Sequence, residues 1–323
     1  MPEQPPPLRL LVTSAGSTAT QNLLLALAEL PAPARPFVVA TDARGRHGGT
    51  GLAGRDERVP RGSDPGFVAA IAALAERYRA DLVLPVFGPE LAAFAAAPPG
   101  CLVGGCTLML SRPEAISAAL SKRGLARAMR ALRIATPEVV DHPTAADLPL
   151  FLRPDGGTGS RQAGRVESPA TLAAALEIEP LAVATRIVEG VELSVDGFAW
   201  PAGRLLHAIC RRRDEVKGGL VVRSTVVAGD GARELARVLV AGLGVAGFFN
   251  FQYFATPGGP VVFDLNPRLS GGMALSFAAG LAPGRCLAIA AGRGGETGRW
   301  GERIGLELVR RWQNLFFAPD ADG

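Results

Sequence analysis

Lysine is nearly absent from this sequence: of 34 lysine and arginine residues, only Lys122 and Lys217 are lysines. A chain that uses arginine elsewhere would keep lysine where a compact ammonium is needed, although chance retention explains the pair equally well. Basic and acidic residues nearly balance, 34 against 30, and the basic ones are scattered. A nucleic-acid partner is therefore not expected.

Cysteine and long hydrophobic runs are also scarce. The four cysteines form neither a CxxC pair nor a dense framework, which argues against a disulfide scaffold. The start of the chain carries no recognisable targeting signal, and each apolar run is interrupted before the ~20 residues that a membrane helix needs. We expect a reduced, cytoplasmic protein with no membrane segment.

An alternation of apolar strands and helical segments occupies the first third of the chain. LRLLVTSAG, FVVATDA and DLVLPVF are expected to be buried strands, with helices in STATQNLLLALAEL and FVAAIAALAERY. Such alternation indicates a parallel sheet with right-handed crossovers. We predict one Rossmann-like α/β domain over residues 1–110.

From residue 111 the pattern changes and predicts a second domain over residues 111–320. A helical linker over 111–136 ends before a proline, and strands around a glycine-rich loop follow in 137–188. The remainder, 189–320, contains longer strands, a helix in ARELARVLVAGLG, a hairpin around TPGG and a helical tail ending near LFFAP. The expected class is α/β, with an α+β arrangement in this second domain.

The hairpin presents polar side chains on one face. Because side chains alternate along a strand, Asn250 and Gln252 share a face of the first strand, and Asp264 and Asn266 share a face of the second. A turn centred on Gly258 would set Gln252 opposite Asp264, and Asn250 opposite Asn266, with Cβ atoms ~5 Å apart. One carboxylate with neutral amides suits Mg²⁺ or Mn²⁺. Taken alone, however, a polar strand facing solvent explains these residues better.

The segment FLRPDGGTGS is a second candidate site. Its glycines permit positive φ and let successive backbone N–H groups converge on an anion, and its hydroxyls add donors. Arg153, just before the loop, would hold a phosphate through two parallel hydrogen bonds. The loop is neither a Walker A sequence nor GxGxxG. A glycine-rich surface hairpin is the simpler explanation of the loop by itself.

Two further segments carry charged candidates. In ATRIVEGVELSVDGF, Glu192 would lie at a crossing between lobes and accept hydrogen bonds from ribose hydroxyls, whereas an ordinary amphipathic strand explains Asp196 well. In CRRRDEVKGGLVVRSTV, we expect Arg211, Arg213 or Lys217 to bind a substrate carboxylate or a phosphate. A solvated charged loop explains that second segment nearly as well.

These segments, in their order, resemble the ATP-grasp superfamily. FLRPDGGTGS, RIVEGVELSVD, GFFNFQYF and VVFDLNPRLSGG carry the resemblance, and NFQ followed by DxNPR is most similar to the synthetase lobes of the carbamoyl-phosphate synthase large subunit. ALSKRGLARAMRALRIATP resembles the family's helix with a phosphate-contacting basic residue, and VTSAG with its helix resembles the N-terminal domain. The resemblance implies an ATP-grasp fold with a mobile lid lobe over 137–188 and a metal-binding lobe over 189–320.

The resemblance also implies roles for individual residues. Gln252, Asp264 and Asn266 would ligate Mg²⁺ or Mn²⁺ on the ATP phosphates. The implied nucleotide-binding residues are Lys122 and Arg153 at the phosphates, Gly156, Gly157, Thr158, Gly159 and Ser160 over them, Arg186, Ile187 and Val188 at the adenine, and Glu192 at the ribose. Arg268 would face the transferred phosphoryl group, and Arg153, Arg213 and Lys217 are the further candidate catalytic residues.

The activity that the resemblance implies is ATP-dependent ligation. A carboxylate would attack ATP to give an acyl phosphate and ADP, and an amine, or a thiol, would then displace phosphate. The expected partners are a small carboxylate, amino-acid-like in character, and a small amine, with a homodimer left open.

Two alternatives to a ligase stay open. Many members have glutamate at Asp264 and an acidic residue near Thr185, and a non-catalytic ATP-binding module would tolerate both changes. An NAD(P)-dependent oxidoreductase is the other alternative, because LVTSAGS precedes a helix and Asp42 ends the next strand, where a ribose-binding carboxylate would lie. The missing GxGxxG and the unexplained VFDLNPRLSGG oppose the oxidoreductase.

Overall fold

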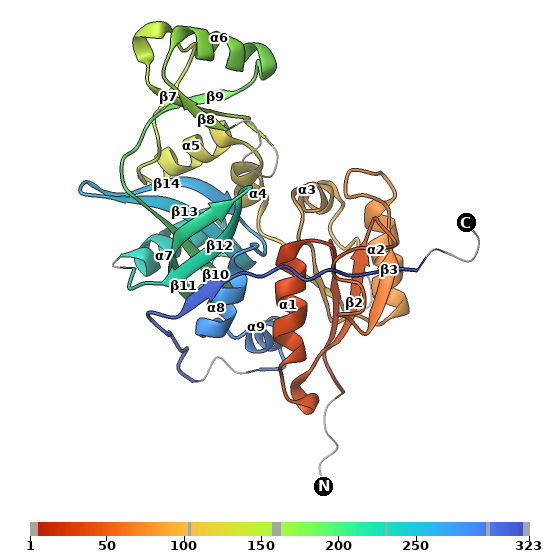
Figure 1. Cartoon of the computed structure of the whole chain (residues 1–323). Helices are drawn as coiled ribbons and strands as arrows, with labels where there is room; N and C mark the ends of the chain where they lie inside the picture. The colour runs from red at the N-terminus through yellow and green to blue at the C-terminus, as the bar shows by residue number, and fades with distance from the viewer. Residues whose placement is uncertain (1–5, 103–104, 157–162, 230, 295–297, 319–323) are drawn as a thin grey trace.

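Three β-sheets organise the chain (Figure 1). The computed structural model describes residues 6–318 apart from 103–104, 157–162, 230 and 295–297. A five-stranded sheet holds the N-terminal strands, a six-stranded sheet lies in the middle of the molecule, and a four-stranded sheet projects from it.

The five-stranded sheet is parallel throughout, with the order β3-β2-β1-β4-β5. Its strands are β1 (Arg9–Val12), β2 (Phe37–Asp42), β3 (Arg55–Arg58), β4 (Leu82–Leu84) and β5 (Thr107–Leu108), and the helices between them are α1 (Thr18–Ala28), α2 (Phe67–Arg77) and α3 (Gly88–Ala96). Leucine and valine dominate the buried strand positions, as both-face burial requires. The predicted parallel α/β arrangement is confirmed.

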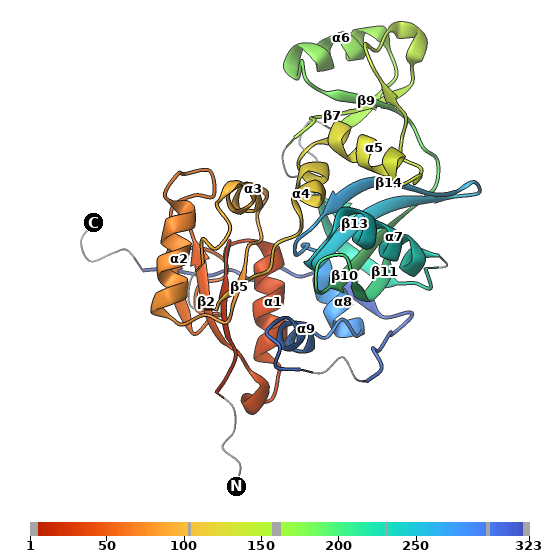
Figure 2. The same ribbon diagram turned by 180° about the vertical axis from the view of Figure 1, so that it is seen from behind.

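The six-stranded sheet is antiparallel and has the order β14-β13-β10-β11-β12-β15. Its strands are β10 (Val191–Ala199), β11 (Leu205–Lys217), β12 (Leu220–Val226), β13 (Gly247–Thr256), β14 (Gly259–Asn266) and β15 (Glu307–Val309), and the helices after β12 and β14 are α7 (Ala232–Leu243), α8 (Met273–Ala279) and α9 (Pro283–Ala290). Side chains of α4 (Pro113–Leu120), α5 (Lys122–Ala131) and α7 form a core with one face of this sheet. At the other face, α8 and α9 lie between the sheet and α1 (Figure 2).

The four-stranded sheet has the order β6-β9-β7-β8 and a small core of its own. Its elements are β6 (Val139–Val140), β7 (Leu150–Arg153), β8 (Gly164–Val166), α6 (Pro169–Ile178) and β9 (Val183–Arg186). Two helices precede it, α4 (Pro113–Leu120) and α5 (Lys122–Ala131), and α5 packs against β14. The mixed α/β class with a parallel sheet and antiparallel sheets is therefore as predicted.

The helical linker differs in detail from its prediction. Ser121 adopts an extended conformation, φ −138° and ψ 132°, and breaks the segment into two helices. Its hydroxyl accepts the Gly124 N–H and so caps α5. The break places Lys122 in the first turn of α5, over the end of β14.

The predicted helical tail is confirmed in its first part, where α8 and α9 lie, and is wrong in its last part. After α9 the described residues contain only the short strand β15. Residues 310–318 are irregular and run past α1 towards the N-terminal sheet (Figure 1), where the Arg46 guanidinium lies 5.8 Å from the centre of the Phe317 ring. Pairing of β15 with β12 explains the loss of helix, because Arg223, Ser224 and Thr225 bind 307–309 as a sheet edge.

Within the described residues, no single helix is long and apolar enough to cross a membrane. Only α8 and α9 taken together, with a 90° bend between them, pass that test of length and composition.

Candidate functional site

A cavity of ≈ 880 Å³ lies where the three sheets meet. Its walls come from α3, α4, the start of α5, the ends of β7 and β9, and one face of β10 to β14. The predicted site residues that line it are Lys122, Arg153, Gly156, Arg186, Ile187, Val188, Glu192, Arg213, Gln252, Asp264, Asn266 and Arg268. The structure thus brings together groups that are up to 146 positions apart in the chain.

The polar face of the β13–β14 hairpin forms the floor of this cavity. Gln252 pairs with Asp264 and Asn250 pairs with Asn266, as the sequence predicts. The turn itself is one position shorter than expected, since Thr256 pairs with Gly259, and a β-bulge beyond Gln252 restores the register. The two deviations cancel at the polar pairs.

Asp264 is the only carboxylate in this group. It forms an ion pair with Lys122 and accepts a hydrogen bond from Asn266 Nδ2 at 2.6 Å. Burial would raise the pKa of the Asp264 carboxyl, but the Lys122 ammonium, the nearby Arg153 and the Asn266 amide lower that pKa below its usual value. Asp264 is therefore ionised at neutral pH and available to a cation.

Two arginines flank Asp264 within the cavity. Arg153 donates from Nη1 to the Phe263 carbonyl at 2.9 Å, while its Nε is buried without a partner among the described residues. Arg268 donates to the Asn266 side chain and to the Leu269 carbonyl, each at 2.9 Å. Burial lowers the pKa of both guanidiniums and Asp264 opposes that change. Both arginines sit where an anion can approach them.

The predicted adenine-binding segment forms an apolar edge of the cavity. Ile187 and Val188 line it directly after β9, and the rings of Phe254 and Phe263 stack nearby with centres 4.5 Å apart. The Arg186 guanidinium, by contrast, is bound to Asp147 at 2.9 Å. Arg186 can therefore contribute its backbone here, while its side chain serves the four-stranded sheet.

Glu192 and Arg213 form an ion pair at the cavity wall. The Glu192 carboxylate lies 2.7 Å from Arg213 Nε, with the Glu192 side chain 35% exposed. Burial lowers the pKa of the Arg213 guanidinium, and Glu192 opposes this. One carboxylate edge is thus engaged with Arg213, and the exposed part faces the cavity.

Lys217 is not brought to the cavity. It ends β11 with its side chain 72% exposed and pairs with Glu215 at 3.0 Å. The neighbouring Val216 and Gly219 line the cavity, but the Lys217 side chain lies in solvent and is not part of the lining. Of the predicted glycine-rich loop, Gly156 lines the cavity, whereas Gly157, Thr158, Gly159 and Ser160 lie outside the described residues.

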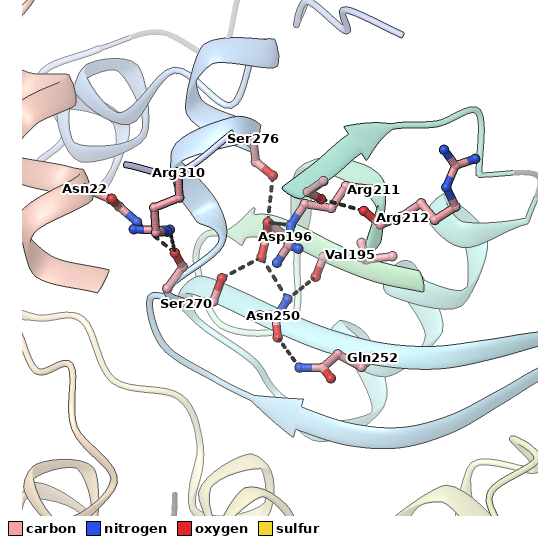
Figure 3. Close-up of polar contacts among 12 residues, drawn as sticks. Asn22, Val195, Asp196, Arg211, Arg212, Asn250, Gln252, Ser270, Ser276 and Arg310 are labelled. Carbon is pink, nitrogen blue, oxygen red and sulfur yellow. Dashed lines mark hydrogen bonds and ion pairs between the residues drawn. The ribbon is translucent and has the colours of Figure 1, made fainter. Parts of the chain in front are cut away.

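Sequence reasoning missed a buried polar cluster next to these residues (Figure 3). Asp196 is fully buried and binds Arg211 Nε at 2.7 Å, Asn250 Nδ2 at 2.8 Å, and the hydroxyls of Ser270 and Ser276 at 2.9 and 2.7 Å. Burial would raise the pKa of the Asp196 carboxyl, but Arg211 and the two serines lower it. An acidic residue inside the otherwise apolar end of ELSVDGFA was the available signal, because a buried carboxylate requires partners.

Comparisons with known proteins agree with this architecture. Residues 178–303 match the model of a family described as ATP-grasp in the biosynthetic pathway with Ter operon. This stretch includes the β10–β14 wall and α8. No curated protein matches the chain in sequence.

Several solved structures are similar to the chain over most of its length. L-amino acid ligase from Bacillus licheniformis is 16% identical with a TM-score of 0.66, over 88% of this chain and 74% of that one. An ADP complex of N5-carboxyaminoimidazole ribonucleotide synthetase is 14% identical with a TM-score of 0.70, over 95% of this chain and 82% of that one. The biotin carboxylase domain of Hydrogenobacter thermophilus 2-oxoglutarate carboxylase, with MgADP, is 15% identical with a TM-score of 0.67, over 93% and 73%. The chain therefore has the fold of ATP-grasp ligases.

Proposed function

We propose that this protein is an ATP-dependent ligase that activates a small carboxylic acid as an acyl phosphate and joins it to an amine. The observation that carries the proposal is the meeting of Lys122, Asp264 and Gln252 on one cavity floor, beside the apolar edge at Ile187 and Val188. The family match over 178–303 and the ligase fold support it. The finer likeness to carbamoyl-phosphate synthase lobes, and a thiol in place of the amine, stay predictions.

The nucleotide would lie across the floor of the cavity. Ile187 and Val188 would offer backbone groups to adenine, and the exposed part of Glu192 would accept hydrogen bonds from ribose. Lys122 and Arg153 would bind the phosphates, which would displace Lys122 from Asp264. Arg268 would face the γ-phosphoryl group, where its charge stabilises the charge that builds up during transfer.

The residues present fit a magnesium ion. Asp264 supplies one ionised carboxylate, and Gln252 and Asn266 supply amide oxygens on facing strands. Mg²⁺ commonly uses one or two carboxylates together with phosphate oxygens and water. When bound, the ion would neutralise phosphate charge. No group of three or more His, Cys, Asp or Glu side chains suited to another metal occurs in the described residues.

Acyl transfer of this kind needs little further chemistry from the protein. Because ATP supplies the leaving group, positioning and charge stabilisation are sufficient, and no nucleophilic side chain has to form a covalent intermediate. The proposed partners are accordingly a small acid and a small amine.

The oxidoreductase alternative loses its main support. The Asp42 carboxylate already accepts the Gly16 N–H at 2.8 Å and the Arg44 N–H at 2.9 Å. The group expected to bind a nicotinamide ribose is therefore engaged by its own loop, and Asp42 does not line the cavity.

The proposal is tested by nucleotide binding followed by turnover. We expect a non-hydrolysable ATP analogue to bind with magnesium, as measured by calorimetry, and ADP release to depend on an added acid. Hydroxylamine can replace the unknown amine, since it converts acyl phosphates to hydroxamates that mass spectrometry detects. Binding without acid-dependent ADP release would favour the non-catalytic module, and failure to bind the analogue would overturn the proposal.

A further inference from the structure

Arg211 reaches the cavity with an unsatisfied charged group. It lines the cavity, its side chain is 2% exposed, and its Nε is bound to Asp196. Nη1 is buried and has no hydrogen-bond partner among the described residues. Leaving a buried charged donor unpaired is costly, so a ligand anion is the expected partner.

Arg211 lies in the same cross-strand row as two of the proposed metal ligands. Cross-strand pairing places Arg211, Ser194, Gln252 and Asp264 in one row across β11, β10, β13 and β14. At the usual strand spacing, Arg211 and Gln252 have Cα atoms about 10 Å apart. Ser194 lies between them, and its hydroxyl is likewise buried without a partner in the described chain. Two unsatisfied polar groups therefore lie in the same row as the proposed metal ligands, and of the two Arg211 lines the cavity.

The surroundings fix the Arg211 guanidinium in place. Asp196 holds Nε, and a Cβ added to Gly272 would overlap the guanidinium, so the loop over residues 270–272 packs directly against it. The Gly271 carbonyl in that loop accepts hydrogen bonds from Asn22 of α1 and from Arg310 after β15 (Figure 3). Arg211 is thus a preorganised cation.

In the described part of the cavity, cationic side chains outnumber carboxylates. Each carboxylate is already paired with a cation, so none is free to bind a ligand ammonium group. The cationic side chains of the cavity, apart from Arg186, which Asp147 holds at the four-stranded sheet, are Lys122, Arg153, Arg211, Arg213 and Arg268. Its carboxylates, Glu192 and Asp264, are each paired with a cation in the described structure. Residues 157–162 contain no Asp or Glu in their sequence. Apolar side chains, including Phe87, Leu91 and Leu220, make up much of the remaining wall.

We infer that Arg211 binds the carboxylate of the acid substrate beside the γ-phosphate, and that this acid has an apolar body and no α-ammonium group. Asp196 is the positioning residue for Arg211. The inference rests on the proposed function. A carboxylate oxygen attacks the γ-phosphorus, the bond from that phosphorus to the β–γ bridging oxygen breaks, and ADP leaves with the electron pair. Arg211 then holds the acyl phosphate until the amine attacks. An amino-acid-like acid, expected from the sequence, is disfavoured.

The test uses four acids with one carbon skeleton: isocaproate, its α-hydroxy and α-keto analogues, and leucine. ADP release is measured with hydroxylamine as the acceptor. The three acids without an ammonium group should reach half-saturation at concentrations about tenfold below that of leucine, because an ammonium would be buried without a counter-charge. Preference for leucine would overturn the substrate class. So would the absence of ADP release with all four acids in a protein that binds the magnesium–ATP analogue.

The role of Arg211 is tested with the paired variant Asp196→Asn/Arg211→Gln, which removes both buried charges and so avoids an unpaired one. Half-saturation for isocaproate should rise about tenfold or more, the value of one charge-assisted hydrogen bond, while affinity for the ATP analogue stays within about twofold. Arg211→Lys should recover part of the effect. Arg212→Gln is the matched control, because Arg212 is the next residue on β11 but is exposed and pairs with Asp214.

Two results for the paired variant would overturn the assignment of Arg211. Unchanged half-saturation would show that the acid binds elsewhere. An equal loss of affinity for the ATP analogue would show that Arg211 binds the nucleotide instead. Failure of the unmodified protein to bind the analogue is a different result and would remove the proposed function itself.

Discussion

One face of the six-stranded sheet changes character along its length. At one end, Phe198 and Phe248 belong to the core that includes α8 and α1. At the other, Gln252 and Asp264 form the cavity floor. Asp196 lies at the boundary, two residues from Phe198 on the same face. The chain therefore moves from core to ligand site within a few residues of one strand.

The ion pairs on the two sides of this boundary differ in the same way. The side chains of Asp196 and Arg211 are 0% and 2% exposed, and the Asp196 carboxylate accepts hydrogen bonds from four side chains. Lys122 and Asp264 are 18% and 19% exposed, and they face the cavity. The first pair is fixed by the fold. The second can be exchanged for ligand charges, because both partners remain accessible from the cavity.

The largest expected difference between the two ion pairs is in the free energy of unfolding that is lost when one partner of each pair is removed. Asp196→Ala leaves Arg211 buried without its counter-charge, so the free energy of unfolding should fall by about 3–5 kcal/mol. Asp264→Ala should lower it by only about 1 kcal/mol, since Lys122 can turn towards the cavity. Urea unfolding measures both changes, provided that the dependence of the unfolding free energy on urea concentration has the same slope in each variant as in the unmodified protein. Similar losses for the two variants would mean that the pairs do not differ in this way.

The second prediction concerns magnesium at the cavity end. Asp264→Asn keeps the shape of the side chain but removes the only carboxylate of the proposed metal ligands. Affinity for the ATP analogue with magnesium should fall about 10–100-fold, while affinity without magnesium should change little. Calorimetric titrations with and without the ion give the ratio. Glu215→Gln, an exposed carboxylate on β11 outside the cavity, should leave both affinities unchanged.

The sequence predicts the cavity end of this face better than the buried end. Alternation along β13 and β14 is a local rule, so it was sufficient to pair Gln252 with Asp264, even though the turn and the bulge each differ from expectation. The partners of Asp196 lie 15, 54, 74 and 80 positions away. No local pattern specifies such contacts. The end of the predicted helical tail differs from expectation for the same reason, because residues 307–309 pair with the distant strand β12.

The third prediction tests the buried end by pH. His207 stacks on Trp300 with ring centres 5.1 Å apart, and its Nε2 bonds the Gly301 carbonyl at 3.0 Å. Burial, together with nearby Arg233, lowers the pKa of His207 to about 4. The unfolded chain binds the proton more readily, at its ordinary pKa near 6.5. The stabilisation from neutral His207 is therefore complete above about pH 6.5 and is lost as pH falls towards 4.

The expected loss over that range is about 1–2 kcal/mol, after allowance for partial solvation of the ring. Urea unfolding at several pH values measures it, and His207→Gln should flatten the dependence between pH 6.5 and 4. Affinity for the ATP analogue should not change in this variant, because His207 does not line the cavity. An equally steep pH dependence in the variant would assign the effect to another group.

The smallest effect is expected at Lys217, the second of the two lysines that the sequence indicates as candidate site residues. Lys217→Ala removes an exposed ammonium that pairs with Glu215 at the far end of β11. Such surface pairs contribute little, so stability should change by less than about 0.5 kcal/mol and analogue affinity by less than about twofold. Lys122→Ala is the matched truncation, and it should weaken analogue binding about tenfold, since it removes a phosphate contact. Equal affinity of the two alanine variants for the analogue would contradict the proposal that Lys122, unlike Lys217, binds phosphate. The ion pair of Lys122 with Asp264 would then have no role in nucleotide binding.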